Sequence, residues 1–412
     1  MECYKIGVLG SVDSGKSTLI GVLKTNKNDD GRGLLRKLVM KHNHELISGR
    51  TSCISYNNVI INDKIFNFID LAGHESYLKT TIYGLNALHL DHVVIIIGAN
   101  MGVNRITEEH FNLAYVLNLP IICIVNKIDI CPNDVLNNTL EDLNKLTKNS
   151  LDIIVNNEKL ENLSMYKKIK VNNSKIKYPL FFTSNKTGEG INDLKNYLTN
   201  LHITYVKKLT NNNLINNNSI FIIQETYNIK GIGIVFYGYQ KNGIIKKGDS
   251  LKIGPFGNNF YTINIRNIRN VIEKDVDILN SGELGCLAIK QLSKDYQFKR
   301  ENIKKGMYIT NNPFCCYEFI AKIYVLHHPT TIKENYQSTI HCGSVTQAAQ
   351  ITEIINVKKN ITTDNKLLRT GDQAKVKFKF LFKPEFIENE ALFIFRESNA
   401  KGVGKIVNAI NY

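Results

Sequence analysis

The chain has 412 residues, of which 43% are hydrophobic and 22% charged, a balance that excludes an intrinsically disordered chain. The length excludes a single ordinary core and predicts two or three domains of about 150 residues each. The net charge of +15 at pH 7 favours a polyanionic partner, nucleic acid first, although the abundance of Lys, Asn and Ile could also reflect a compositional bias.

The N-terminus leads almost at once into a strand-like segment, without the basic and apolar regions of a signal peptide. The longest apolar run, Val93 to Ala99, is far shorter than the roughly 20 residues needed to span a bilayer. The eight cysteines include no Cys-x-x-Cys pair, which indicates reduced thiols rather than a zinc site. We therefore expect a cytoplasmic protein with no membrane segment.

Short aliphatic strands alternate with helical stretches from Tyr4 to about His202. This alternation predicts a mostly parallel β-sheet with helices on both faces. The expected strands are residues 4–9, 65–69, 93–98, 121–125 and 180–183.

The first expected strand runs directly into Gly10-Ser-Val-Asp-Ser-Gly15-Lys16-Ser17, which fits the phosphate-binding pattern G-x-x-x-x-G-K-[ST]. Its backbone amides and the start of the following helix should bind phosphates, and Lys16 should reach the β and γ phosphates. Ser17 should supply a hydroxyl to Mg²⁺. The nucleotide contacts expected from this segment are Ser11, Val12, Asp13, Ser14, Gly15, Lys16, Ser17 and Thr18.

The polar segment between this motif and the next strand, residues 29–50, is typical of a mobile first switch. Thr51 is the expected second protein ligand of Mg²⁺, because a threonine offers a hydroxyl to the metal and a carbonyl to the water; Ser52 is the alternative.

A second motif, Asp70-Leu-Ala-Gly73-His74, follows the strand 65–69. Asp70 is expected to bind Mg²⁺ through a water molecule, and the amide of Gly73 to contact the γ-phosphate. The segment that follows should be released when that phosphate leaves. His74 is the expected catalytic residue, since a histidine directly after this glycine can orient the attacking water.

A third motif, Asn126-Lys127-Ile-Asp129, follows the strand 121–125 and predicts recognition of guanine. The carboxylate of Asp129 can accept hydrogens from N1 and the exocyclic amine of guanine, whereas adenine carries an acceptor at N1. Lys127 should lie along the base, and Asn126 should brace the loops. Thr183-Ser184-Asn185, at the end of the last expected strand, should bring a backbone amide to the guanine O6, and Lys186 is a further expected nucleotide contact.

The segment 211–218 is almost all Asn and is expected to be a linker. Beyond it, short alternating strands separated by glycines predict two small β-barrels. The expected architecture is an α/β P-loop domain over residues 1–205, followed by β-barrel domains over residues 219–310 and 316–412.

With these motifs in this order, the chain resembles the translational GTPases of the elongation factor Tu and elongation factor 1-alpha superfamily, and most of all the eukaryotic GTP-binding protein 1 and 2 branch. Longer strings carry the resemblance along essentially the whole chain. Among them are Asp30-Gly-Arg-Gly, His42-x-His-Glu-x-x-Ser-Gly-Arg-Thr-Ser52, Asp70-Leu-Ala-Gly-His-Glu-x-Tyr-Leu-Lys-Thr-Thr81, Gly231-Ile-Gly-Ile-Val-Phe-Tyr-Gly238 and Val325-Leu-His-His-Pro-Thr-Thr331.

The resemblance implies a GTPase in which Val12 gates access of the catalytic His74 to the water. Arg50 departs from the pattern, because elongation factor Tu has an isoleucine there that forms the other half of the gate. The resemblance also leads us to expect no long N-terminal extension and a shortened stretch at Asn57 to Lys64.

The partners that the resemblance implies are an aminoacylated tRNA, held by the second and third domains, and the ribosome. We expect a monomer that uses GTP, GDP and Mg²⁺. The alternative is a regulatory, RNA-decay or ribosome-rescue adaptor that recruits protein partners in RNA surveillance; basic charge disfavours a third possibility, a GTPase of sulfate activation. Basic residues compatible with RNA binding are Arg266, Arg269, Lys375, Lys377, Lys379, Arg396 and Lys401.

Overall fold

The computed structural model of the protein describes residues 3–40, 54–74, 77–153, 177–201, 218–271, 274–292, 299–358, 367–397 and 400–410. The chain forms two compact units, residues 1–85 with 89–205 and residues 86–88 with 206–412. Each unit is described by itself below.

The first unit contains a seven-stranded sheet in the order β2-β3-β1-β4-β5-β7-β6. All neighbours are parallel except the edge strand β2, which is antiparallel to β3. The predicted, mostly parallel sheet is therefore confirmed. Its strands are β1 (Cys3–Gly10), β2 (Ser55–Ile61), β3 (Lys64–Asp70), β4 (His92–Gly98), β5 (Ile121–Asn126), β6 (Leu151–Ile153) and β7 (Tyr178–Thr183).

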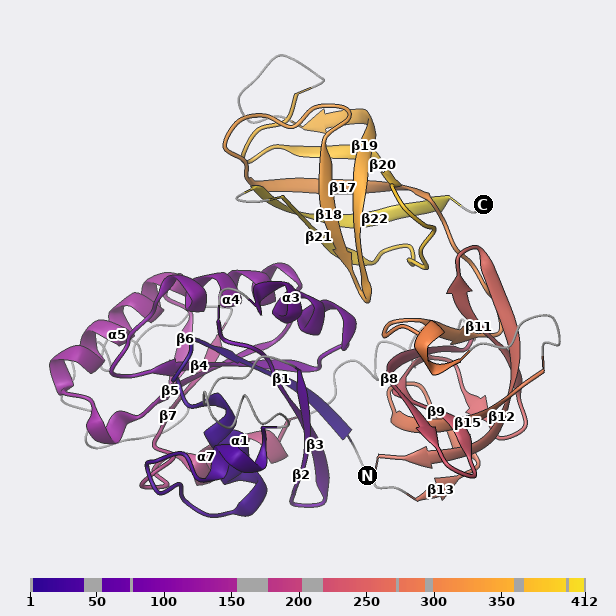
Figure 1. The fold of residues 1–412 in the computed structure, drawn as a ribbon. Helices are drawn as coiled ribbons and strands as arrows, with labels where there is room; N and C mark the ends of the chain where they lie inside the picture. The colour runs from indigo at the N-terminus through magenta and orange to yellow at the C-terminus, as the bar shows by residue number, and fades with distance from the viewer. Residues whose placement is uncertain are drawn as a thin grey trace. The chain divides into compact units, whose positions relative to one another are not determined.

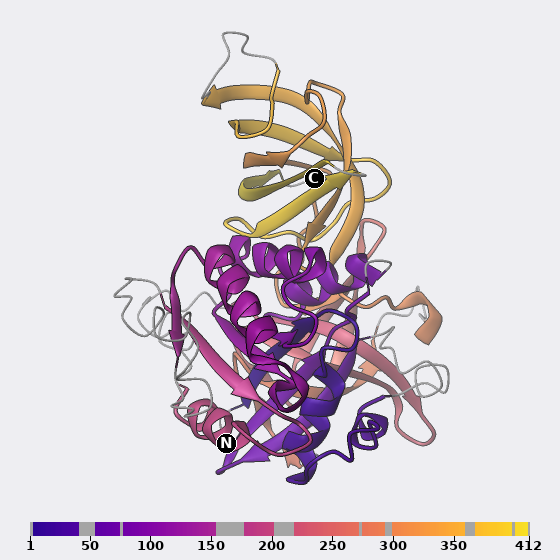
Figure 2. The same ribbon diagram turned by 90° about the vertical axis from the view of Figure 1, so that its left-hand side faces the viewer.

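Helices cover both faces of this sheet, as predicted (Figure 1 and Figure 2). On one face, α1 and α7 pack their aliphatic side chains against strand residues such as Ile6 and Val8, which are almost fully buried. Helices α3, α4 and α5 lie on the other face. The helices are α1 (Lys16–Thr25), α3 (Leu78–Ala87), α4 (Arg105–Val116), α5 (Asn133–Leu146) and α7 (Ile191–Thr199), with the short 3-10 helices η1 (Leu35–Leu38) and η3 (Ile128–Ile130).

Strands β2 and β6 were not among the expected strands. The strand β2 contains Asn57 and Asn58, residues that are depleted in strands, and its exposed positions alternate with buried ones, as suits an edge strand. The strand β6 has three residues, too few to show a period-two pattern. Both lie at the edges of the sheet, so the core prediction is unaffected.

The parallel sheet determines where the motifs meet. The carboxyl ends of β1, β3, β5 and β7 lie at one edge of the sheet, and each of these strands runs directly into one of the motif loops. Ligands of open α/β sheets bind at this edge.

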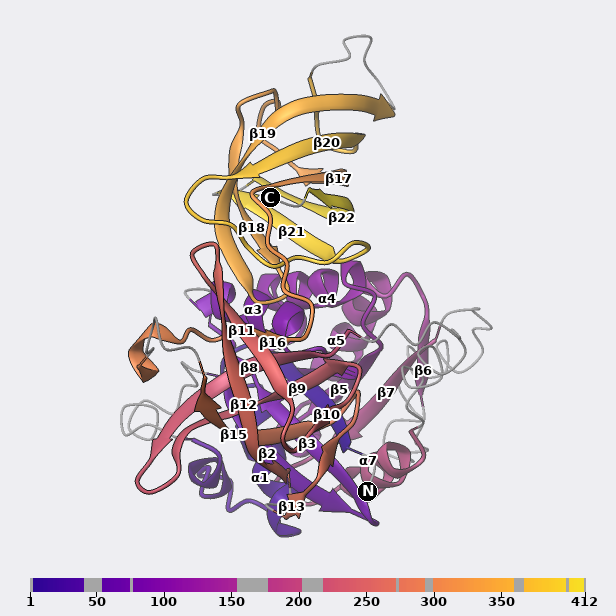
Figure 3. The ribbon, with the colours of Figure 1, turned by 90° about the vertical axis from the view of Figure 1, so that its right-hand side faces the viewer.

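The second unit contains two β-barrels (Figure 3). In the first, the ring β11-β16-β8-β9-β15-β12 closes through pairing of β12 with β11 and encloses an aliphatic core. The strands of the ring are β8 (Ile220–Ile229), β9 (Gly233–Asn242), β11 (Ser250–Phe256), β12 (Asn259–Asn270), β15 (Leu284–Gln291) and β16 (Tyr308–Thr310). The short strand β13 (Asp275–Val276) pairs with β12, while β10 (Ile245–Lys246) and β14 (Ile278–Leu279) form a separate two-stranded sheet.

The second barrel is the closed ring β17-β20-β19-β18-β21-β22. Phe319 is fully buried at its centre, with ring centroids 5.2 Å from Phe378 and 5.8 Å from Phe393. The two predicted barrels are thus confirmed. The strands are β17 (Glu318–His327), β18 (Gln337–Cys342), β19 (Val345–Lys358), β20 (Gln373–Phe380), β21 (Leu392–Glu397) and β22 (Ala400–Ile410).

The helices and the cysteines bear on the predictions about membrane spans and about disulfides or zinc sites. Within the described ranges, no helix has both the length and the apolar character needed to cross a membrane. The cysteines at positions 3, 123, 131, 286, 315, 316 and 342 are free thiols.

Helix α4 buries a histidine, His110, which is only 2% exposed. Within the described part of the chain, its Nδ1 has no hydrogen-bond partner. Burial and, to a smaller extent, the nearby positive charge of Lys16 together lower the pKa of His110 from 6.5 to about 3. The folded protein therefore keeps His110 neutral at pH values where the unfolded chain protonates it.

We predict that His110 makes the protein less stable in acid. Because the folded pKa lies below the unfolded one, the free energy of unfolding should fall as pH drops below 6.5, by up to about 1.4 kcal/mol per pH unit. His110→Gln should reduce this slope between pH 6.5 and pH 4.5. Urea unfolding can be followed by far-ultraviolet circular dichroism, whose signal comes mainly from the helices of the first unit. Equal slopes for both proteins would contradict the prediction.

Candidate functional site

The loop between β1 and α1 is shaped by glycine. Gly15 precedes α1 with φ +96°, a left-handed conformation that favours glycine. A Cβ at this position would lie 2.3 Å from the side-chain nitrogen of Asn126, so a larger residue would displace Asn126. The close approach of these two residues therefore requires glycine.

Lys16, the first residue of α1, lies with its ammonium group inside this loop. Its Nζ donates to the carbonyl oxygens of Gly10 at 3.0 Å and Ser11 at 2.7 Å. Burial lowers the pKa of Lys16, while the negative charge of Asp70 acts in the opposite direction. The loop thus holds a buried cation beside the amides expected to bind phosphate.

A hydroxyl and a carboxylate meet next to this lysine. Ser17 Oγ donates to Asp70 Oδ2 at 2.5 Å, and Asp70 is fully buried at the end of β3. Both are hard oxygen ligands of the kind that Mg²⁺ prefers, and Mg²⁺ is commonly held by one or two such groups together with substrate phosphates. Within the described residues no cluster of three or more His, Cys, Asp or Glu side chains could hold a metal alone. The donor set therefore fits a magnesium ion that arrives with a phosphate ligand.

Asn126 joins the phosphate-binding loop to the loop expected to bind the base. Its Nδ2 donates to the carbonyl of Ser14 at 2.9 Å, and its Oδ1 accepts from Thr183 Oγ1 at 3.2 Å. Asn126 is fully buried, so these bonds are protected from water. The expected bracing by Asn126 corresponds to these two hydrogen bonds.

Two further bonds align the loop after β7. Ser184 Oγ donates to Asp129 Oδ1 at 2.7 Å, and Asn185 Nδ2 donates to the carbonyl of Gly15 at 3.2 Å. Lys127 adopts a left-handed conformation with φ +67°, after which Asp129 lies in a short 3-10 helix. Three loops from separate strand ends are thus tied together.

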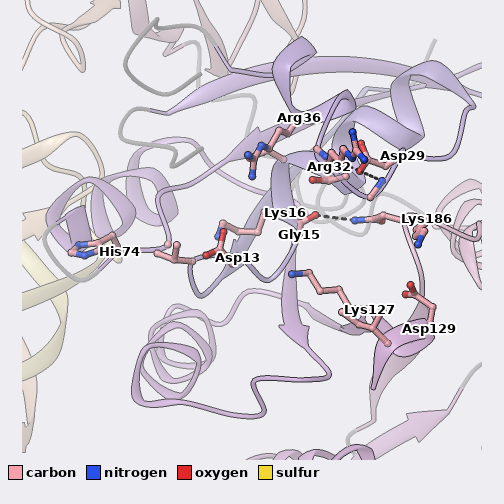
Figure 4. A pocket seen from close by; sticks show the side chains of 18 residues that line it. Asp13, Gly15, Lys16, Asp29, Arg32, Arg36, His74, Lys127, Asp129 and Lys186 are labelled. Atoms are coloured by element: carbon pink, nitrogen blue, oxygen red, sulfur yellow. Dashed lines mark hydrogen bonds between the residues drawn. The ribbon is translucent and has the colours of Figure 1, made fainter. Parts of the chain in front are cut away.

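These loops enclose a cavity of about 330 Å³, a volume in the range of small-molecule sites (Figure 4). Five cationic side chains and three carboxylates line it. The lining residues are Val12, Asp13, Gly15, Lys16, Ser17, Thr18, Asp29, Gly31, Arg32, Gly33, Arg36, Gly73, His74, Lys127, Asp129, Ile130, Asn185 and Lys186.

Most of the residues expected from the sequence line this cavity. The buried residues Ser11, Ser14, Asp70, Asn126 and Ser184 lie behind its surface and support the loops. Thr51, with its alternative Ser52 and with Arg50, lies outside the described residues.

Gly73 and His74 lie at one end of the cavity. A Cβ on Gly73 would lie 2.5 Å from both the Gly10 carbonyl and Lys16 Nζ, so this peptide lies directly against the phosphate-binding loop. His74 is half-buried, with its ring centroid 6.1 Å from that of Tyr77. In Figure 4, His74 and Lys186 mark opposite ends of the pocket, with Asp13 and Lys16 between them.

Four further residues line the pocket that were not predicted from the sequence: Asp29, Arg32, Arg36 and Ile130. The string Asp30-Gly-Arg-Gly was noted as a family feature, and that signal could have pointed to this segment. The first part of the expected mobile switch is packed, since Leu35 and Val39 are buried in the core of the first unit.

Comparison with known proteins identifies the family of the chain. The elongation factor Tu GTP-binding domain model matches residues 1–204, and the elongation factor Tu C-terminal domain model matches residues 313–410. The chain is 35% identical to GTP-binding protein 1 of Xenopus laevis over 98% of its own length and 63% of that protein. It is 32% identical to human GTP-binding protein 2 over 98% of the chain and 69% of that protein.

Among solved structures, the chain is similar to translation elongation factor SelB from Methanococcus maripaludis in complex with the GTP analogue GppNHp. The TM-score is 0.71 at 18% identity, over all of this chain and 80% of that one. This likeness establishes the three-domain fold. By its sequence relatives and its domain order, the chain is a translational GTPase of the GTP-binding protein 1 and 2 family.

Proposed function

We propose that the cavity binds GTP and GDP and that the protein hydrolyses GTP as a molecular switch. The observation that carries this proposal is the Asn126 side chain, which bonds the loop suited to phosphates to the loop suited to guanine. Both loops line one cavity, so a single ligand with a base and phosphates can contact both at once.

Guanine recognition follows from the acceptor at Asp129. Its carboxylate can accept two hydrogens from the guanine edge, and Ser184 already donates to one of its oxygens at 2.7 Å, which fixes its orientation. Adenine would set an acceptor against this carboxylate, at a high cost in free energy. Lys127 and Lys186 line the same end of the cavity and can flank the base.

Phosphate binding follows from the backbone and from Lys16. The backbone amides of residues 11–18 surround the start of α1, where the helix dipole favours an anion. Lys16 lines the cavity and can donate to the β and γ phosphates.

Ser17 and Asp70 would hold Mg²⁺ together with the phosphates, Asp70 through a water molecule, and Thr51 is the further ligand that we propose. When bound, the ion would offset the negative charge of the phosphate oxygens. The Ser17–Asp70 hydrogen bond supports this assignment, because it brings two oxygen atoms that can bind a metal ion together at the phosphate end of the cavity.

Hydrolysis is assigned to His74, which lines the cavity at the end away from the base and can orient a water molecule towards the γ-phosphate. The amide of Gly73 would contact that phosphate and lose the contact after hydrolysis, which makes the following segment a switch. Val12 also lines the cavity and can restrict access of His74 to the water.

We predict that Asp129→Asn shifts the preference from guanine to xanthine nucleotides, because an amide donates where the carboxylate only accepts. GTP affinity should fall by about a hundredfold and xanthosine triphosphate affinity should rise. Equilibrium titration with fluorescent nucleotides measures both affinities. Asp134→Asn, on the exposed face of α5, is a matched control that should bind GTP as the wild type does. Unchanged GTP affinity in Asp129→Asn would show that the base binds elsewhere.

We predict that His74→Ala leaves GTP binding intact and slows turnover at least about tenfold, since it removes a water-positioning group and no nucleotide contact. Single-turnover phosphate release measures the rate, and the same preparation gives the affinity. His328→Ala, in the loop that follows β17, is the matched histidine control, since His328 is also half-buried. Wild-type turnover in His74→Ala would exclude His74 from the mechanism.

We further propose that the protein binds aminoacylated tRNA and the ribosome. Family membership and the net charge of +15 support this proposal. Lys322 on β17 is directly opposite Lys375 on β20. On its other side it is opposite Lys405 on β22, which also pairs with Glu390. Like charges in register across strands repel one another, and a bound polyanion would relieve this repulsion. Arg269 and Lys377 are weaker candidates for RNA contacts, because they pair with Asp275 and Glu318.

The alternative remains an adaptor for RNA decay or ribosome rescue, in which the nucleotide state controls binding of a protein partner and no tRNA is delivered. Nucleotide binding and hydrolysis would be the same in both functions, so only the molecule that the GTP-bound protein binds distinguishes an adaptor from a tRNA-delivery factor. Either function implies a protein that works in the cytoplasm, where ribosomes and messenger RNA meet, and a monomer is sufficient for both.

We predict that filter binding will show GTP-dependent retention of charged tRNA. Four conditions suffice: charged or uncharged tRNA, each with GTP or with GDP. Tighter binding of charged tRNA in GTP would support delivery. The lack of any GTP-dependent preference for charged tRNA would remove the delivery function and favour the adaptor.

A further inference from the structure

The segment between α1 and η1 is folded around a single carboxylate. Asp29 is 7% exposed and accepts hydrogen bonds from the backbone amides of Gly31, Gly33 and Leu35, at 3.0, 3.1 and 3.0 Å. Its own amide donates to the carbonyl of Asn185 at 2.8 Å. Asp29 therefore gives this segment a fixed shape and attaches it to the loop after β7.

The other end of the segment is fixed by apolar packing. Leu35 is 6% exposed and belongs to the core of the first unit, and a Cβ on Gly21 of α1 would lie 2.6 Å from the Leu35 carbonyl. Between the two attachment points, Gly31 lies beside Lys186, since its Cβ would be 3.3 Å from Lys186 Cδ. The segment thus extends along the cavity from its base end.

This fixed segment presents two arginines to the cavity, Arg32 and Arg36. Gly33 has φ +81°, and a Cβ there would lie 2.7 Å from Arg36 Nε, so glycine allows the Arg36 side chain to fold closely over the loop. Figure 4 shows Arg32 and Arg36 on the same side of the pocket as Asp29, with Arg36 towards Lys16 and the phosphate-binding loop.

The chemistry of these side chains indicates what they bind. Among the described residues, no salt bridge joins either guanidinium to a carboxylate, and Asp29, the carboxylate of this segment that lines the cavity, already accepts hydrogen bonds from three amides. A planar guanidinium donates two parallel hydrogen bonds and suits phosphate oxygens. A second and a third cation beside Lys16 would be costly in a cavity that binds a neutral ligand.

We propose that Arg32 and Arg36 donate hydrogen bonds to the phosphate groups of the bound nucleotide and that Asp29 is the positioning residue that holds them there. This inference rests on the proposed nucleotide binding and adds a second phosphate-binding element, separate from the loop of residues 10–17. The strand-end loops would then bind the base and the phosphates, and the segment 29–36 would add further contacts to the phosphates.

The test compares affinities for GTP, GDP and guanosine in the full chain. Arg32→Ala and Arg36→Ala should each weaken GTP and GDP about tenfold and leave guanosine unchanged, because only phosphate contacts are lost. Arg36→Lys should recover part of the affinity. Lys37→Ala, on the exposed side of η1 and outside the cavity lining, removes the same charge and should change affinity less than about twofold.

Asp29→Asn tests the positioning role through a double-mutant cycle. In the wild-type background it should weaken GTP binding by about as much as the loss of both arginines. In the Arg32→Ala, Arg36→Ala background it should add less than about a twofold change, because the groups that it positions are gone. Full additivity would show that Asp29 acts independently and would overturn its positioning role.

Three results would overturn the inference itself. Arginine variants that bind GTP and GDP as Lys37→Ala does would exclude phosphate contacts. If the variants lose as much affinity for guanosine as for GTP, the arginines contact the nucleoside. If GTP hydrolysis slows while the affinities stay unchanged, the arginines act in the chemical step. A wild-type protein that binds no guanine nucleotide would instead refute the proposed function, so the two failures are distinguishable.

Discussion

The site depends on one buried hydrogen-bonded bridge. Asn126 ends β5, and its amide bonds the carbonyl of Ser14 on one side and Thr183 on the other. Because the amide is fully buried, each lost bond would leave a polar group unsatisfied away from water. This makes the relative position of phosphate loop and base loop a property of the core rather than of the surface. The separation between these two loops is thereby fixed before a nucleotide binds.

Much of the first unit could be predicted from sequence because its signals are local. A strand–glycine loop–lysine pattern such as Gly10 to Ser17 requires no knowledge of distant contacts, and the parallel sheet then brings every motif to one edge. The barrels followed from alternating residues and glycine-rich turns. What these patterns predict is therefore the type of each element and the set of strand ends that meet.

The rest could not be predicted because it depends on contacts between residues far apart in the chain. Arg36 carries no local pattern that separates it from a solvated surface charge, and Arg32 stands only in the family string Asp30-Gly-Arg-Gly. Their place at the cavity follows from the three amides bound by Asp29. The edge strand β2 was missed because its polar residues hide the alternation. The proposed role of Thr51 lies outside the described residues and stays a prediction.

The carboxylate of Asp29 also limits how the chain can vary in length. It binds amides at alternate positions, 31, 33 and 35, so inserting or deleting one residue between Asp29 and Leu35 would move the wrong amides towards its oxygens. The same change would pull Leu35 away from the core. Relatives with this acid should therefore keep the spacing constant and accommodate added residues elsewhere, which gives a criterion for recognising the segment in other sequences.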